Sequence, residues 1–516
     1  MFFQKVKSSD LIGRLNTEAY SPGHVLASQL MINSALNILP LGDIVSKKIN
    51  NSIRNVKGEL NIKGATIPMF RPADISCGVA DSESAPKLTK EFESVHSKAR
   101  VKAGDIVLGI AGSVGVAGRV PSNVEYGNIN GSSARIATNK DFISAFLLAY
   151  LQSKYGQSSL LRYSVGSVQK HLNLEDLPAV NVVMPENSAT QYIGNKVRQA
   201  ETLREWSKNL EDYVRHYHIA LIPTQTTLQF DRKTRSVFAA KMTDRLDAHF
   251  YPAVVEDYLE INGVDFEILN RLCLTVFNGQ TQPEISEEVC EQITVTNLSS
   301  SFLKGEPRWV KKPASNDKYL KPHDLLICNA AHNKSYIGRE ITYVHSEKPL
   351  LPSTEVMVIR INRDLVPASY ILSYLLTKLG FVQLQSTIRG ITAHSYPRDV
   401  KQLEIPIPKI PKEKKKLWFA CDDLMAKAGL ATEISGVLTN AAKQLVEALI
   451  ENKLTEQELI SAQQALERGD NTLDRQILSR STTKGIGDED GAPLFPDLDQ
   501  LYDLLNQAEK SQEVIP

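Results

Sequence analysis

Residues 189–222 read ATQYIGNKVRQAETLREWSKNLEDYVRHYHIALI, and their apolar side chains recur about every 3.5 residues, the period of a coiled coil. Pro223 follows directly and cannot continue a helix. A second stripe of similar period lies between residues 413 and 454. We predict two helices, each on the order of 50–60 Å long, that pack antiparallel against each other and hold two globular halves apart. The packing positions are Ile193, Val197, Leu203, Leu210 and Leu221 in the first helix, and Leu417, Leu424, Ile434, Leu438 and Leu445 in the second.

An internal repeat surrounds these stripes, with 219 to 231 residues between matching motifs. Because the motifs keep their order with small drifts in spacing, we interpret the chain as a duplication with insertions in loops. The alternative is two unrelated domains that share generic strand and helix patterns. The matches are Arg14–Tyr20 with Arg245–Tyr251, Arg71–Ile75 with Val295–Leu298, Gly104–Leu108 with His323–Ile327, Gly118-Arg119 with Gly338-Arg339, Ala145–Leu151 with Ser369–Leu375, Gly156 with Gly380, Gly166 with Gly390, His171 with His394, Asp176 with Asp399, and Val182–Pro185 with Ile405–Pro408.

Within each half, short runs typical of strands precede a helix of about a dozen residues and a last strand. The predicted fold class is therefore α+β, with tandem domains at 1–187 and 224–411 and antiparallel coiled-coil spacer helices at 188–223 and 412–454. Residues 455–516 form a helical and acidic C-terminal segment. Thr455 and Glu458 have the spacing of a capping box, which predicts a helix to about Arg468. After Gly469 we expect a loose, acidic tail with one short amphipathic piece near 498–505.

Composition limits the functional classes. The formal net charge is zero, but residues 481–516 carry −6, so the rest carries +6, a weak basic excess compatible with local DNA-facing patches. The five cysteines lie far apart and none forms a Cys-x-x-Cys pair. That spacing argues against a disulfide framework or a structural zinc site and fits a reducing cytoplasm. No apolar run reaches the ~18 residues that a membrane span needs.

The ordered repeat resembles the specificity subunits of type I restriction-modification systems, over most of residues 10–450. The half-start motif is present as Arg14–Tyr20 and Arg245–Tyr251, and the Gly-Asp-Ile strand as Gly104–Ile106, degenerate at His323–Leu325. The Gln-x-Ile that opens the family's helix is present as Gln191–Ile193, whereas the second half has the lysine-rich run Lys412–Lys416 instead. Related subunits also serve other methylation-based phage-defence systems.

The resemblance implies that two target-recognition domains each read half of a bipartite, asymmetric double-stranded DNA site. It also implies that two DNA adenine methyltransferase subunits dock on the spacer helices and that an ATP-dependent restriction and translocation subunit joins them. S-adenosylmethionine would be bound by the partner methyltransferase, so no cofactor is expected on this chain. The expected location is the cytoplasm.

No sequence motif indicates catalysis by this chain. Asn-Pro-Pro-Tyr, Asp-Pro-Pro-Tyr, Walker and His-Glu-x-x-His motifs are absent, and no serine lies in a nucleophile elbow. Glycines recur every third residue between Gly109 and Gly118, which could indicate a phosphate-binding loop. The equivalent segment of the second half, 329–338, lacks these glycines, so a tight hairpin with its backbone close to DNA is the better interpretation.

Two polar segments in each half are the candidate DNA contacts, because basic and amide side chains beside glycines suit phosphates and base edges. The alternative is a recurring polar surface loop. His171 and His394 could equally be structural, and we expect no metal site; Arg14 and Arg245 are predicted to anchor the half-starts. The candidates are Arg162, Ser167, Gln169, Lys170 and His171 in the first half, and Asn329, His332, Asn333, Lys334, Arg389, Thr392 and His394 in the second.

The favoured hypothesis is a non-catalytic subunit that reads DNA sequence for a partner methyltransferase. A second hypothesis is an adaptor of a defence complex that kept the duplicated fold but lost base recognition. A third is a stand-alone nuclease or methyltransferase, which would be active as a single purified chain. DNA binding separates the first two hypotheses, because only a reader protects two defined patches of sequence.

Overall fold

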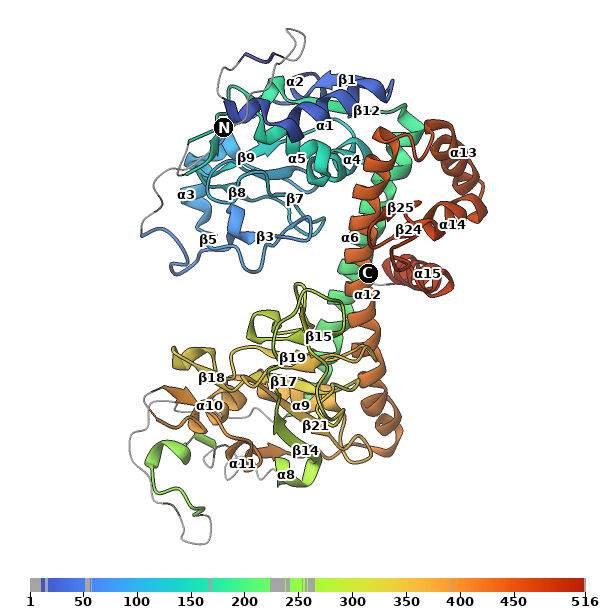
Figure 1. The fold of residues 1–516 in the computed structure, drawn as a ribbon. Helices are drawn as coiled ribbons and strands as arrows, with labels where there is room; N and C mark the ends of the chain where they lie inside the picture. Colours follow the sequence, from blue (N-terminus) through green and yellow to red (C-terminus); the bar gives the residue numbers. More distant parts are fainter. Residues whose placement is uncertain are drawn as a thin grey trace. The chain divides into compact units, whose positions relative to one another are not determined.

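The computed structural model describes residues 11–13, 17–51, 56, 58–166, 169–222, 237, 242–252, 254–255, 258, 265–390 and 392–514 (Figure 1). The chain divides into two compact units, residues 1–204 with 433–516, and residues 205–432. Each unit contains one α+β globule and part of the two long helices, α6 (Asn187–Ala220) and α12 (Lys412–Ile450). In the part of the chain that is described, no helix is long and apolar enough to cross a membrane.

The first globule is built on a five-stranded sheet of order β3-β4-β7-β6-β9 and a three-stranded sheet of order β5-β2-β8. Strands β1 and β12 form a separate antiparallel pair. The strands are β1 (Asn37–Pro40), β2 (Ile67–Phe70), β3 (Ile75–Ser76), β4 (Val79–Ala80), β5 (Lys87–Leu88), β6 (Ile106–Gly109), β7 (Ala117–Arg119), β8 (Asn128–Ile129), β9 (Ser133–Ile136), β10 (Ser164–Val165), β11 (His171–Leu172) and β12 (Asn181–Met184). The helices are η2 (Thr17–Tyr20), α1 (Pro22–Asn33), α2 (Leu41–Ile44), η3 (Pro72–Asp74), α3 (Lys90–Val95), η4 (Ser97–Ala99), α4 (Asp141–Gln152), α5 (Lys154–Leu161) and η5 (Leu177–Ala179).

The second globule has a four-stranded sheet of order β14-β21-β17-β19 and a three-stranded sheet of order β16-β15-β20, while β13 pairs with β23. The strands are β13 (Phe266–Ile268), β14 (Cys273–Asn278), β15 (Cys290–Ile293), β16 (Arg308–Val310), β17 (Leu325–Cys328), β18 (Ala330–Ala331), β19 (Ile341–Tyr343), β20 (Leu351–Pro352), β21 (Val356–Ile361), β22 (Ala393–His394) and β23 (Glu404–Pro406). The helices are η7 (Ala248–Phe250), α8 (Leu269–Leu272), η8 (Val295–Asn297), η9 (Lys334–Tyr336), α9 (Ala368–Leu375), α10 (Lys378–Ser386) and α11 (Pro397–Val400).

Strand register shows that the two globules share one core topology. β6 pairs with β7 and β9 as β17 pairs with β19 and β21, with Ile106 and Leu325 in the same position. β2 lies parallel to β8 and antiparallel to β5, as β15 does to β20 and β16. Asp74 and Asn297 each close a short 3-10 helix by accepting a backbone N–H three residues earlier. The predicted duplication therefore holds at the level of topology.

One of the predicted repeat matches is wrong. Ile106 pairs with Arg119, and the equivalent Leu325 pairs with Tyr343, so Gly118-Arg119 corresponds to Thr342-Tyr343 and not to Gly338-Arg339. The segment between the strands is longer in the second globule, 329–340 against 110–116, and that insertion shifts the register. Arg119 is buried and bonds to Glu201 at 2.8 Å, whereas Arg339 is exposed.

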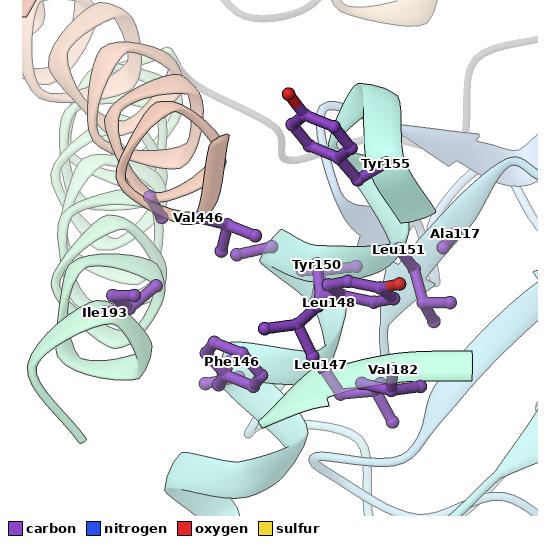
Figure 2. Close-up of a cluster of buried hydrophobic side chains, with 14 of the residues drawn as sticks. Ala117, Phe146, Leu147, Leu148, Tyr150, Leu151, Tyr155, Val182, Ile193 and Val446 are labelled. Carbon is purple, nitrogen blue, oxygen red and sulfur yellow. The ribbon is translucent and has the colours of Figure 1, made fainter. Parts of the chain in front are cut away.

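A helix pair with a tight elbow follows the sheet in both globules. Ser153 caps α5 by accepting from Gly156 N at 3.1 Å, and Thr377 caps α10 by accepting from Gly380 N at 3.1 Å. A Cβ at Gly156 would overlap the carbonyl oxygen of Tyr150, so the elbow requires glycine there. Figure 2 shows the side chains of α4, among them Phe146 and Leu148, between the long helices and β12.

Within each unit, the long helices pack antiparallel. In the first unit, Ile193 and Val197 of α6 share a core with Leu445 and Leu449 of α12. In the second unit, the Ser207 hydroxyl donates to the carbonyl of Ala428 at 2.7 Å, and Val214 packs in the core that contains Cys421.

One of the predicted packing positions is wrong. Leu417 is 37% exposed, and the neighbouring Trp418 takes the buried position. Leu221 follows the end of α6 at Ala220 and is half-buried against the core of the second unit. The buried packing positions are Ile193, Val197, Leu203, Ile434, Leu438 and Leu445, with Leu210 and Leu424 half-buried.

The C-terminal segment is folded, which corrects the prediction of a loose tail. The predicted helix is present as α13 (Glu456–Glu467), capped reciprocally by Thr455 and Glu458. It is followed by α14 (Thr472–Ser479), a hairpin of β24 (Ser481–Thr482) and β25 (Gly485–Ile486), and α15 (Leu498–Val514). Asp474 is fully buried and accepts from Lys196 Nζ at 2.7 Å, which ties the segment to α6. Its acidic side chains therefore belong to a packed subdomain.

Candidate nucleic-acid interface

The two candidate segments of the first globule meet. The segment after β6 and the β10–β11 hairpin form a bridge in which Ala111 pairs antiparallel with His171. Leu172 N also donates to Ile110 O at 2.8 Å. Gly166 has φ +97°, and a Cβ there would overlap the carbonyl oxygen of Gln169, so the hairpin depends on glycine.

The same arrangement recurs in the second globule. β18, directly after β17, pairs antiparallel with β22, so that Ala330 lies opposite His394 and Ala331 opposite Ala393. Arg389 N and His394 N exchange backbone hydrogen bonds with each other's carbonyls, which closes the turn around Gly390. Segments about 60 residues apart in the sequence therefore form one paired-loop surface in each globule. We call these surfaces the first and second paired loops.

Most of the predicted contact residues lie exposed on the paired loops. Lys170 is half-exposed and pairs with Glu18 at 3.6 Å, which is a weak exposed ion pair. Asn333 accepts from Ser335 N at 3.0 Å and so holds the turn at η9. Ser167 lies outside the described residues, and His394 is half-buried. The exposed candidates are Gln169, Lys170 and His171 on the first paired loops, and His332, Asn333, Lys334 and Thr392 on the second.

Arg162 and Asn329 have structural positions, which corrects their selection as base or phosphate contacts. Arg162 is 6% exposed, and its Nε donates to the carbonyl of Ala19 at 3.1 Å. Asn329 is 4% exposed, and its Nδ2 donates to the carbonyl of Thr354 at 2.9 Å. Because both side chains satisfy buried backbone groups, neither is available to DNA in this fold.

The side chain of Arg389 also makes its main contacts with other residues of the protein. Its guanidinium forms a bidentate pair with Asp399, both bonds being 2.6 Å, and the hydrogen bond to that carboxylate raises the pKa of Arg389. Its side chain remains 25% exposed, so one edge faces solvent. Arg245 is buried and donates to the carbonyls of Thr387 and Ile388, which confirms the predicted anchoring role. Arg14 lies outside the described residues.

The glycine-rich segment is a hairpin. A phosphate-binding fingerprint needs a strand followed by a helix, but β6 is followed by the antiparallel strand β7. A Cβ at Gly109 would overlap the carbonyl oxygen of Ser113, and Gly112 and Gly115 have φ of +76° and +86°. Glycine therefore serves the tight turn. In the described residues, no group of three His, Cys, Asp or Glu side chains is arranged to hold a metal ion.

Two further residues of the second paired loops, Tyr336 and Arg339, were not among the predicted contacts. Tyr336 is 51% exposed at the end of η9, and the Arg339 guanidinium carbon lies 5.6 Å from the centroid of its ring. The sequence could have indicated both residues, because they lie in the segment that is longer in the second half. The incorrect match of Arg339 with Arg119 hid this insertion.

Part of the chain is similar to known proteins. Residues 34–211 match the model of the family described as type I restriction modification DNA specificity domain. The type I restriction enzyme EcoBI specificity subunit of Escherichia coli is 30% identical over 149 residues, 29% of this chain and 31% of that protein. The match thus spans about a third of the length of that curated relative.

Two solved structures are similar over most of the chain. The S subunit of a type I restriction-modification system from M. genitalium is 12% identical, with 82% of this chain and 97% of that chain covered and a TM-score of 0.36. The HsdS subunit from Thermoanaerobacter tengcongensis is 15% identical, with 81% and 97% covered and a TM-score of 0.27.

Proposed function

We propose that the chain recognises DNA sequence on behalf of a partner methyltransferase, because residues 34–211 match the family model described as type I restriction modification DNA specificity domain. The observation that carries the proposal is the recurrence of paired loops with exposed polar and basic side chains at equivalent places in both globules. A scaffold that had lost base recognition would have no need of such a surface twice. Exposed amide and basic groups on paired backbone segments suit base edges and phosphates.

In this proposal each globule is a target-recognition domain that reads half of a bipartite, asymmetric site. Asymmetry follows from the loops themselves, since the first offers a glycine turn and the second a longer insertion. The long helices α6 and α12 serve as an antiparallel coiled-coil spacer that sets the gap between half-sites. Their antiparallel packing within each unit supports this role.

The chain contributes recognition, and partner subunits contribute the chemistry. We propose two DNA adenine methyltransferase subunits as partners, each with its own S-adenosylmethionine, and an ATP-dependent restriction subunit as a further partner. The adaptor alternative shares these protein partners but not the DNA site. DNA recognition is therefore the property to test.

The test is to map methylated bases in host DNA with and without the chain, co-expressed with its methyltransferase. We expect a split, non-palindromic motif that disappears without the chain, and two footprints on that motif about a helical turn apart. Salt-sensitive binding without sequence preference would favour the adaptor, and methylation by the isolated chain would contradict a non-catalytic role.

A matched pair of variants tests the paired loops directly. Lys170→Ala removes an exposed cation from the first paired loops, and Lys102→Ala removes an exposed cation elsewhere in the same unit. We expect only Lys170→Ala to weaken binding and to reduce its salt dependence by about one phosphate contact. Equal binding by both variants would exclude Lys170 from the interface.

A further inference from the structure

The second paired loops present a tyrosine ring and an arginine side chain next to each other, and neither residue type occurs in the corresponding segments 110–116 and 164–172 of the first paired loops. The segment between β17 and β19 covers residues 329–340, and the equivalent segment between β6 and β7 covers only 110–116. The shorter one is a glycine turn. The longer one forms the short helix η9, with Tyr336 at its end.

The protein fixes this turn in place. Ile337, next to Tyr336, is fully buried in a small cluster with Ile388 and Ala393. Gln385 Nε2 of α10 donates to the carbonyls of Lys334, at 3.0 Å, and of Ile337. The turn thus has an apolar anchor and two side-chain hydrogen bonds, although its surface is polar.

Backbone geometry limits what the next position tolerates. Gly338 has φ +74°, and a Cβ there would lie 2.7 Å from Cβ of Leu384. The chain therefore turns sharply after the buried Ile337 and returns Arg339 to the surface beside Tyr336.

Within this fixed turn, the side chains of Tyr336 and Arg339 lie at the surface and are not part of the buried cluster that anchors the turn. Half of the Tyr336 surface is in water, and the Arg339 guanidinium carbon lies 5.6 Å from its ring centroid. In the part of the chain that the structure describes, no carboxylate within 4.0 Å neutralises Arg339 or the neighbouring Lys334. A lone exposed tyrosine is ordinary, but an unneutralised cation beside it on a fixed turn suits the phosphates and groove edges of duplex DNA.

We propose that Tyr336 and Arg339 together contact the DNA half-site of the second domain and set part of its sequence preference. This inference rests on the proposed function. The tyrosine ring supplies apolar surface for a thymine methyl group or a sugar in the groove, and the guanidinium supplies donors for a phosphate or a guanine edge. Because the first paired loops have no counterpart to this pair, its loss should alter recognition of one half-site only.

The experiment uses the full chain assembled with its methyltransferase and a duplex that contains the mapped site. Tyr336→Ala should weaken binding about 10-fold, the scale of losing one groove contact to the duplex, whereas Tyr336→Phe should bind as the wild type does. Arg339→Ala should weaken binding and lower its salt dependence. Methylated-base mapping of Tyr336→Ala should show relaxed preference in the second half-site and an unchanged first half-site.

Leu365→Ala is the matched control. Leu365 is 52% exposed in the same unit and lies just after the end of β21 at Ile361. The paired loops adjoin the opposite end of that strand, where Val356 pairs with Cys328. The Leu365→Ala complex should bind the duplex as the wild type does. Binding of Tyr336→Ala within twofold of wild type, with an unchanged motif, would overturn the inference, as would loss of methyltransferase assembly with DNA binding intact. A wild-type complex without any preferred sequence would instead refute the proposed function.

Discussion

Substitution of Asp474 by asparagine should detach the C-terminal subdomain from α6. Asp474 is fully buried and accepts from Lys196 Nζ at 2.7 Å and from the hydroxyls of Tyr192 and Tyr502, each at 2.5 Å. Burial alone would raise the pKa of Asp474, but Lys196 and the two hydroxyls outweigh it and lower that pKa. The carboxylate is therefore held ionised against a lysine that is itself 1% exposed.

The magnitude follows from what the variant leaves behind. Asp474→Asn keeps the shape but leaves Lys196 as an uncompensated buried charge, which costs about 3–5 kcal/mol. The subdomain would open before the rest of the unit, because the lost ion pair lies at its contact with α6, while the apolar contacts of Leu459 and Ile477 with the core remain. Tyr502→Phe removes one hydrogen bond and should cost only about 1–2 kcal/mol.

Limited proteolysis of the full chain, read by mass spectrometry, measures this opening. We expect Asp474→Asn to be cut within residues 455–514 at least ten times faster than wild type, and the exposed Glu489→Gln to be cut at the wild-type rate. The double variant Lys196→Met with Asp474→Leu should recover protection, because it removes both charges. Equal cutting of Asp474→Asn and Glu489→Gln would refute the reasoning.

Two further predictions concern the cores. Gly156→Ala should destabilise the first unit by about 1–3 kcal/mol, because its Cβ would overlap the Tyr150 carbonyl. Gly436 of α12 has open space around it, so Gly436→Ala should stabilise the same unit by up to ~1 kcal/mol. Denaturant unfolding of the two variants measures both changes. Burial lowers the pKa of His218 from 6.5 to about 4, so the unfolded chain takes up the proton first and stability should fall as pH drops from about 6.5 to 4, by up to ~3 kcal/mol. Unfolding midpoints across that range should fall less steeply in His218→Gln, and parallel curves would contradict the assignment.

The long helices and the duplication could be predicted because both depend on patterns that survive in a single sequence. A 3.5-residue apolar period identifies a helix stripe without knowledge of its partner. The period does not determine which of two neighbouring residues is buried at the margin of the apolar face. Leu417 and Trp418 both fit the period, and the larger indole takes the core position while Leu417 remains 37% exposed.

The C-terminal subdomain was not predictable from composition, because composition averages over a few decisive buried groups. Its acidic residues suggested a solvated tail, yet Asp474 meets a lysine almost 280 positions earlier in the chain. A single sequence gives no sign of such a pairing. The buried roles of Arg162 and Asn329 were hidden for the same reason, since their partners are backbone carbonyls of Ala19 and Thr354.

In the proposed function, the two paired loops let one topology support two different specificities. The pairing of Ala111 with His171 and of Ala330 with His394 is backbone geometry, and it constrains few side chains. Insertions between the strands can therefore change length and chemistry without disturbing the sheet, as the longer segment 329–340 does. Since the anchors, such as Ile337 and Gln385, lie beneath the turn and the variable groups lie above it, recognition can diverge between the domains while both keep the same core.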